Sequence, residues 1–200
     1  MKKLLWLLSA VPLFGYTYYY SDQFSTINLT KWSQNGSIVA SGQIAGLTAS
    51  STNGGSLISL VAVPDGTSQY EAKATLDIAA NGGTFTVYLN ASSDALSGPA
   101  ASGSYYAAEL QNPTCNAGAC SATLVLYSRV NGVVTQLNST TATFTLAPTP
   151  FTTSNTTATL RAVRAAGNII GVYVNDVEYF WITDSNLTTG MPGVGGRAMA

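Results

Sequence analysis

Alternation of polar and apolar side chains runs through the chain from Asp22 onward, and this period of two constrains the fold more than any other feature. In residues 70–78 the odd-numbered positions are polar and the even-numbered positions are apolar or aromatic. Such alternation is typical of a strand with one buried face. No stretch repeats apolar residues every three or four positions over a dozen residues, as an amphipathic helix would. We therefore predict an all-β protein.

Turn signals separate the predicted strands at short intervals. Asn131-Gly132 is the clearest, because a two-residue hairpin turn needs positive φ at both central positions, which Asn and Gly tolerate best. Ala166-Gly167-Asn168 and Asn175-Asp176 predict two further reversals. The other predicted strands cover residues 84–90, 104–111, 122–130, 158–165, 169–174 and 177–182. Short strands with a turn about every ten residues favour a two-sheet antiparallel β-sandwich, such as a jelly roll. Residues 147–157, rich in Thr and Pro, are interpreted as a surface loop within this one domain.

Composition excludes several classes of function. Charged residues are 8% of the 200 residues and the net charge is −1, so no polybasic surface for nucleic acid is expected. The chain contains no histidine, which removes Ser-His-Asp and Cys-His catalysis and every zinc site that uses imidazole. Hydrophobic residues make up 46%, which is sufficient for a packed core.

The amino-terminal segment has the pattern of an export signal. Lys2 and Lys3 precede an apolar run over residues 4–15, which is too short to span a bilayer. We interpret residues 1–20 as a signal peptide or N-terminal hydrophobic anchor, and residues 21–200 as the β-sandwich. A buried N-terminal helix is the alternative interpretation. The expected location is secreted or at the cell surface, with membrane contact only through an uncleaved N-terminal segment.

Cys115 and Cys120 are the two cysteines of the chain and enclose a four-residue loop. In an exported protein we predict that they form a structural disulfide that fixes a loop tip. A redox or metal pair is the alternative, but the two-residue spacing and further ligands that it needs are missing.

The alternation also predicts one polar, aromatic face across three strands. If Val87 and Leu89 point inward, Tyr88 and Asn90 point outward, and the same parity applies to the next two strands. Sugar rings combine an apolar face with a fringe of hydroxyl groups, so flat aromatic rings edged by amide and charged groups suit them. The predicted ligand-binding residues are Tyr88, Asn90, Tyr105, Glu109, Gln111, Tyr127 and Arg129. Alternatively, tyrosine simply favours strands and covers the sheet. Trp32 and Trp181 are assigned to the core.

Three local patterns resemble the concanavalin A-like lectin/glucanase superfamily, in particular its laminin-G-like jelly-roll members. The first is Asp22-Gln23-Phe24-Ser25, followed by Leu29, Trp32 and Gly36. The second is the strand 170–174, a turn at Asn175-Asp176, a strand to Trp181, and then Asp184, Gly190, Gly193 and Gly195. The third is Tyr105-Tyr106-Ala107-Ala108-Glu109-Leu110. Together these patterns span residues 22–197.

The resemblance implies a curved sandwich whose concave face or loop rim receives sugars. It also implies a final strand beside the first, and residues 196–200 offer no alternating segment for that strand, so the domain is expected to be a fragment without its last strand or to leave an exposed edge. Catalytic members carry paired carboxylates in the pattern Glu-X-Asp-X-X-Glu, which this chain lacks, so no catalytic residue is assigned.

We therefore predict an exported, non-catalytic, lectin-like module that binds a glycan or cell-surface polysaccharide. The alternatives are a structural or adhesive cell-surface domain without a small ligand and, with less support, a glycoside hydrolase. No cofactor and no metal site are predicted. Calcium is common in the superfamily, but only Asp65, Asp94 and Asp184 offer oxygen ligands, without a motif.

Overall fold

The computed structural model describes residues 29–36, 38–41, 44–47, 54–60, 69–78, 82–149 and 152–197. Residues 1–20, predicted as a signal peptide or N-terminal anchor, and Asp22–Ser25, which begin the resemblance, lie outside these ranges. The described elements are β1 (Trp32–Gly36), β2 (Ile38–Ser41), β3 (Ile44–Leu47), β4 (Gly55–Ser59), β5 (Tyr70–Asp77), β6 (Thr84–Ala91), β7 (Tyr105–Asn116), β8 (Ala119–Val130), β9 (Val133–Thr145), β10 (Ala147–Thr149), β11 (Thr152–Ala165), the 3₁₀ turn η1 (Ala166–Asn168), β12 (Ile169–Val174), β13 (Val177–Thr183) and β14 (Met191–Arg197).

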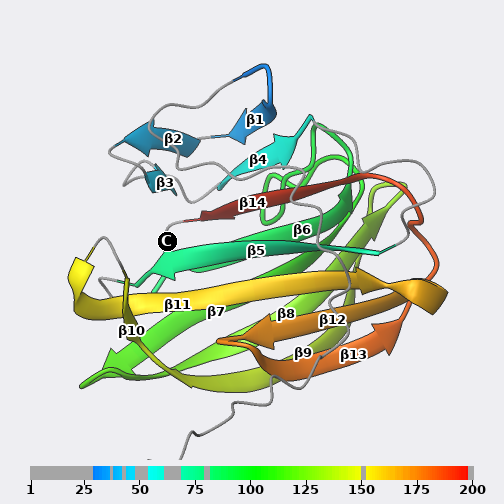
Figure 1. Ribbon diagram of the computed structural model, residues 1–200. Coiled ribbons are helices and arrows are strands. Elements are labelled where there is room, and N and C mark those ends of the chain that lie inside the picture. The colour runs from blue at the N-terminus through cyan, green and yellow to red at the C-terminus, as the bar shows by residue number, and fades with distance from the viewer. Residues whose placement is uncertain are drawn as a thin grey trace, which may run out of the picture.

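The strands form two sheets that lie face to face (Figure 1). The larger sheet has seven strands in the order β1-β4-β14-β6-β7-β8-β9. The smaller sheet has the order β10-β11-β12-β13, with β5 paired to β11, while β2 and β3 form a separate two-stranded sheet. Every pair in the described part of the chain is antiparallel. The predicted two-sheet antiparallel sandwich is confirmed.

Left-handed residues close the predicted hairpins. Asn131 and Gly132 have φ of 52° and 83° between β8 and β9, and Asn175 and Asp176 also have positive φ between β12 and β13. Within the β7–β8 hairpin, Cys115 lies directly opposite Cys120 and the two form a disulfide. The hairpin turns and the disulfide predicted from the sequence are therefore confirmed.

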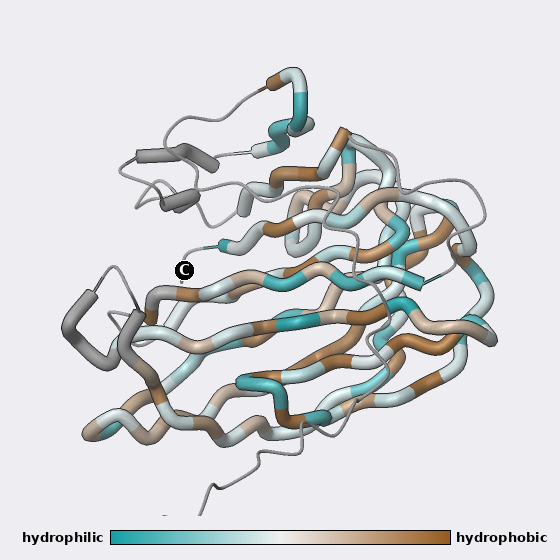
Figure 2. Tube along the Cα trace, viewed as in Figure 1, coloured by the Kyte–Doolittle hydropathy of each residue, from teal (hydrophilic) through white to brown (hydrophobic). Residues whose placement is uncertain are grey.

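The interior between the two sheets holds the main core. Apolar and polar segments alternate along the strands, as the hydropathy colouring shows (Figure 2). The largest buried side chains of this core include Leu76, Val87, Leu89, Tyr106, Leu110, Leu124, Leu126, Leu160, Ile170, Val172 and Phe180. They come from both sheets, so burial of one face of each sheet holds the sandwich together.

Residues 147–157, predicted as a loop, are mostly strand. They contain β10 and the start of β11, which pair with each other at Ala147 and Thr157. The β-branched threonines of this segment favour an extended backbone, so the loop prediction from composition was wrong.

The glycine-rich end of the chain, in which no strand was predicted, forms β14 between β4 and β6. Side chains are excluded there by the neighbouring strands. A Cβ atom on Gly195 would lie 2.5 Å from the carbonyl oxygen of Gly55, and one on Gly193 would lie 2.8 Å from that of Leu57. Because close strand packing requires glycine at these positions, β14 carries no alternating apolar pattern.

β9 is an edge strand of the larger sheet and contains no charged residue over its 13 positions. Side chains from the smaller sheet contact its main chain near the carboxyl end. The Tyr179 hydroxyl donates to the carbonyl of Thr143 at 2.8 Å and accepts from the amide of Thr143 at 3.1 Å. The Asn175 amide donates to the carbonyl of Thr145 at 2.7 Å. These bonds replace part of the missing strand neighbour.

The described residues include no helix with the length and apolar character needed to cross a membrane.

Candidate functional site

The predicted parity of the strands is correct. Val87 and Leu89 of β6 belong to the core between the sheets, whereas Tyr88 points to the outer face of the larger sheet. Tyr105 of β7 lies on the same outer face, beside Tyr88, with 5.5 Å between the ring centroids and an angle of 82° between the rings. The outer face therefore brings together side chains from neighbouring strands, as expected.

Tyr88 and Tyr105 are nevertheless buried, with exposed fractions of 0% and 1%. They belong to a second apolar cluster with Ile58, Ala91, Ala95 and Ala107. The connection from β6 to β7, residues 92–104, supplies Ala95 to this cluster, and we call it the cover loop. Its Ser97 amide donates to the Tyr88 hydroxyl at 3.1 Å, and its Ser97 hydroxyl lies 2.9 Å from the same oxygen. The expectation that the Tyr88 ring is exposed to a ligand was wrong, because this loop packs over it. Tyr105 is almost fully buried but still lines the groove described below.

Side chains of distant strands hold the cover loop on the sheet. The Asn35 amide of β1 donates to the carbonyl of Ser93 at 2.9 Å, and the Ser56 hydroxyl of β4 donates to the carbonyl of Ala95. At the base of the loop, the Ser92 amide donates to the carbonyl of Ser104 at 2.9 Å. The loop is therefore a fixed part of the outer face.

Asn90, also predicted to bind ligand, is buried as well. It has a φ of 49°, and its main-chain amide donates to the Tyr70 hydroxyl at 2.7 Å. Burial raises the pKa of Tyr70 to about 12. Asn90 therefore serves the packing of β6 against β5, and its assignment to an exposed surface was wrong.

A groove opens on the outer face beside the cover loop. Its volume is about 200 Å³ and its lining residues are Ser97, Gly98, Tyr105, Glu109, Tyr127, Val134 and Arg197. They come from the cover loop, β7, β8, β9 and β14. Pockets that enclose drug-sized ligands measure about 300–1,000 Å³, so this groove has room for one ring or a chain end.

Charged groups at the floor of the groove are fixed by one another. Glu109 is 1% exposed, and its carboxylate accepts from Arg197 Nη2 at 3.3 Å and from Gln111 Nε2 at 2.6 Å. Arg197 Nε also donates to Thr84 Oγ1 at 3.3 Å. Burial, together with the negative charge of Glu109, raises the pKa of Tyr105 to about 12. The Tyr105 hydroxyl is therefore neutral at physiological pH.

Among the predicted ligand-binding residues, the most exposed are Gln111 of β7 and Tyr127 and Arg129 of β8. Each of the three is half-buried, whereas the others are buried. Tyr127 lines the groove. Arg129 donates from Nη1 to the carbonyl of Gly103, at the end of the cover loop. The predicted set is thus divided. Tyr105, Glu109 and Tyr127 line the groove, whereas Tyr88 and Asn90 do not. Gln111 contacts Glu109, and Arg129 contacts the cover loop.

Sequence reasoning missed Arg197, Val134 and the cover-loop residues Ser97 and Gly98. The predicted hairpin at Asn131-Gly132 does place Val134 on the strand next to that of Tyr127. Arg197, in contrast, lies in the glycine-rich segment, where no strand was expected. No sequence signal links the cover loop to this face.

No group of three or more Cys, Asp or Glu side chains that could hold a metal ion occurs in the described ranges. Asp94 accepts from the Ser92 hydroxyl at 2.6 Å, and Asp184 accepts from the Tyr106 hydroxyl and from the amide of Asn186. Asp65 lies outside the described residues. The expectation of no cofactor stays a prediction.

The two antiparallel sheets have the concanavalin A-like jelly-roll arrangement, and the resemblance to this superfamily is confirmed at the level of the fold. Three solved structures illustrate it. A carbohydrate-binding module from Bacillus subtilis is 17% identical with a TM-score of 0.53, over 84% of this chain and 88% of that chain. A legume lectin-like domain from Entamoeba histolytica is 12% identical with a TM-score of 0.56, over 85% and 82%.

The third is a β-glucanase from Bacillus licheniformis, 15% identical with a TM-score of 0.50, over 90% of this chain and 84% of that chain. No family model and no curated protein matches the sequence. The similar structures therefore include binding proteins and a hydrolase, and the laminin-G-like subfamily stays a prediction.

Proposed function

We propose that the protein binds a neutral glycan in the groove on the outer face of the larger sheet. The observation that carries this proposal is the combination of the Tyr127 ring with a fixed polar floor. Tyr127 offers an aromatic surface for the apolar face of a sugar ring. Arg197 lines the groove and is held by Glu109, so its remaining N–H groups are positioned to donate to hydroxyl groups without a large loss of side-chain entropy.

We further propose that binding is not followed by hydrolysis. Glycosidases of the common two-carboxylate type place two carboxyl groups about 5–9.5 Å apart around the scissile bond. The groove lining contains one carboxylate, that of Glu109. That carboxylate already accepts from Arg197 and Gln111, and no second carboxyl group of the described residues lines the groove as its partner. Release of reducing sugar from a soluble polysaccharide that the protein binds would contradict this part of the proposal.

Export to the cell surface or the medium is proposed with this function. The Cys115–Cys120 disulfide is compatible with an extracellular location, because disulfides persist in oxidising compartments. The twelve-residue apolar run near the amino end supports the same location from the sequence.

Replacement of Tyr127 by alanine tests the groove. Loss of one aromatic contact removes about 1 kcal/mol, so we expect retention on a binding glycan to weaken about fivefold. The measurement is a glycan array with the full chain, followed by affinity electrophoresis on the soluble polysaccharides that it identifies. Tyr127→Phe keeps the ring and is expected to bind like the unchanged protein, as is Val133→Ala, an exposed change on β9.

Equal retention of Y127A and the unchanged protein would remove the groove as the site. Absence of any retention by the unchanged protein would contradict glycan binding and favour the structural or adhesive alternative.

A further inference from the structure

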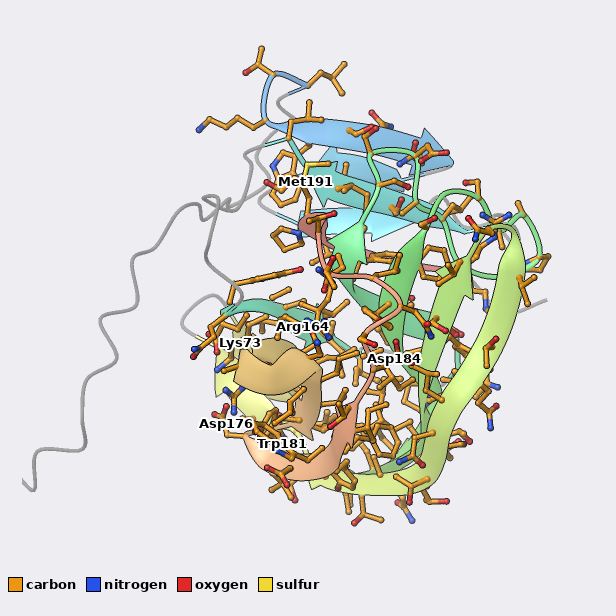
Figure 3. All side chains as sticks on the ribbon, turned by 90° about the vertical axis from the view of Figure 1, so that its right-hand side faces the viewer. Lys73, Arg164, Asp176, Trp181, Asp184 and Met191 are labelled. Atoms are coloured by element: carbon orange, nitrogen blue, oxygen red, sulfur yellow. A yellow bond between two sulfur atoms is a disulfide. The ribbon has the colours of Figure 1, made fainter. Side chains whose placement is uncertain are left out.

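An exposed indole lies on the opposite side of the molecule, on the outer face of the smaller sheet. Trp181 of β13 is 48% exposed, so its assignment to the core was wrong. Its neighbours Phe180 and Ile182 point into the core instead. Figure 3 shows Trp181, Asp176 and Lys73 along the same outer flank.

Gly171 of β12 leaves the space in which the indole lies on the sheet. Gly171 pairs with Trp181, and a Cβ atom on Gly171 would lie 2.6 Å from Cζ3 and 2.7 Å from Cε3 of the indole. The same Cβ position is 3.0 Å from Cε2 of Tyr173. Both aromatic rings therefore occupy the space that a side chain at Gly171 would fill. The six-membered ring of the indole therefore lies next to Gly171, and Trp181 keeps about half of its surface exposed. We call Trp181 and Tyr173 the aromatic shelf.

Polar groups border the shelf on one side. The guanidinium carbon of Arg161 lies 3.9 Å from the ring centroid of Tyr173, and Arg161 pairs with Glu71 at 3.2 Å. The Tyr173 hydroxyl donates to Glu178 Oε2 at 3.2 Å. Hydrogen-bond donors and acceptors therefore lie next to the aromatic shelf. Across the neighbouring strands β13, β12 and β11, the order of the side chains is Trp181, Tyr173 and Arg161.

The charges beside the shelf are paired rather than of one sign. Asp176 contacts Arg161 at 3.5 Å and Lys73 at 3.6 Å. Such paired groups do not select a strongly charged ligand. Among the large apolar side chains that the described residues expose, only Trp181 and Val177 belong to the smaller sheet. A stable protein interface buries about 1,200–2,000 Å² with an apolar centre. A single exposed indole offers much less apolar surface, which matches the size of one sugar ring.

We propose that the aromatic shelf is a second sugar-binding site, which takes a ring of a neutral polysaccharide. The apolar face of the ring stacks on Trp181, and its hydroxyl groups meet Arg161 and Glu178. The ligand class is that of the proposed function, but the site is independent of the groove. Because the two sites lie on opposite faces of the sandwich, one molecule bridges two polysaccharide chains or two segments of one chain.

The test uses affinity electrophoresis of the full chain in gels that contain xyloglucan, galactomannan or mixed-linkage β-glucan. Trp181→Ala is expected to weaken retardation about three- to tenfold on a polysaccharide that retards the unchanged protein. Val177→Ala, an exposed apolar change in the same sheet, is the matched control and is expected to have no effect. On the same polysaccharide, light scattering is expected to report cross-linked particles with the unchanged protein and none with W181A.

Equal retardation of W181A and the unchanged protein on every polysaccharide, including no retardation of either, overturns the inference. Should W181A fail to fold, W181F takes its place. The tryptophan emission of the unchanged protein is then expected to shift to shorter wavelength on ligand addition, and that shift is expected to be lost in W181F. An unshifted emission of the unchanged protein also overturns the inference.

Y127A separates this inference from the proposed function. If only W181A loses retardation, the shelf stands and the groove fails. If only Y127A loses it, the groove stands and the shelf fails. Partial losses in both variants, and a complete loss in the double variant, support two sites.

Discussion

Replacement of Arg164 by methionine is expected to destabilise the protein by about 3–5 kcal/mol, because it removes a buried cation that donates four hydrogen bonds. Arg164 is 3% exposed and points between the sheets from β11 (Figure 3). Its guanidinium donates to the carbonyls of Asn168, Asp184 and Leu187 at 3.0–3.2 Å and to Oδ1 of Asn168 at 2.9 Å. It also lies 5.6 Å from the centroid of the Tyr106 ring.

Methionine fills similar space but donates none of these hydrogen bonds, and each bond from a charged donor contributes about 1.5–3 kcal/mol. The carbonyls of Asn168 and Asp184 keep bonds from the Asp184 amide and the Tyr106 hydroxyl, respectively, so the largest loss is expected at Oδ1 of Asn168 and the carbonyl of Leu187. The measurement is the free energy of unfolding in urea. Arg161→Met is the matched control on the same strand, where the partially exposed ion pair with Glu71 contributes about 1 kcal/mol or less. Equal urea midpoints for R164M and R161M would contradict a structural role for Arg164.

Raising the pH from 10 to 12 is expected to unfold the protein cooperatively. Burial is the main cause that raises the pKa of Tyr70, Tyr105 and Tyr106 from the ordinary value of 10.0 to about 12, and it raises that of Tyr88 further. The folded state thus holds these protons more tightly than the unfolded state. Its stability is complete below pH 10 and falls as the pH rises toward the folded pKa values.

For each such tyrosine the free energy of unfolding falls by about 1.4 kcal/mol per pH unit in this window. The four losses add up, and a typical domain has a free energy of unfolding of only about 5–15 kcal/mol. The measurement compares tyrosinate absorbance with the circular dichroism of the sheets during an alkaline titration. The two signals are expected to change together in the upper part of the window. Tyr105→Phe removes one titrating group and is expected to move the transition to higher pH. Complete ionisation of all tyrosines with unchanged dichroism would contradict the burial of these four.

The alternation and turn residues were sufficient to predict the sandwich, because both act locally. Asn131-Gly132 and Asn175-Asp176 have positive φ, which their own side chains favour, and the parity of β6 follows from Val87 and Leu89 alone. β14 was not predicted, because its glycines are required by close packing against β4 and β6. These strands lie more than a hundred positions away from the glycines in the sequence.

The candidate site was predicted only in part, because parity decides which face a side chain joins and not what covers that face. Tyr88 lies on the expected side, yet the cover loop packs on it through bonds from Asn35 and Ser56, which are 58 and 39 positions away from their loop partners. Trp181 lies in an apolar run that covers both faces of β13, so the sequence did not distinguish its exposed position from that of buried Phe180.

The contacts of Tyr179 and Asn175 with β9 have a consequence for self-assembly. A thirteen-residue strand of uncharged, mostly β-branched and hydroxyl-bearing residues is the kind of segment on which further copies stack into fibres. An incoming copy would need the amide and carbonyl of Thr143, and a phenol already holds both. Growth of a fibre from this part of the strand therefore requires the Tyr179 and Asn175 side chains to leave β9 first, so these bonds protect the edge as long as they are intact.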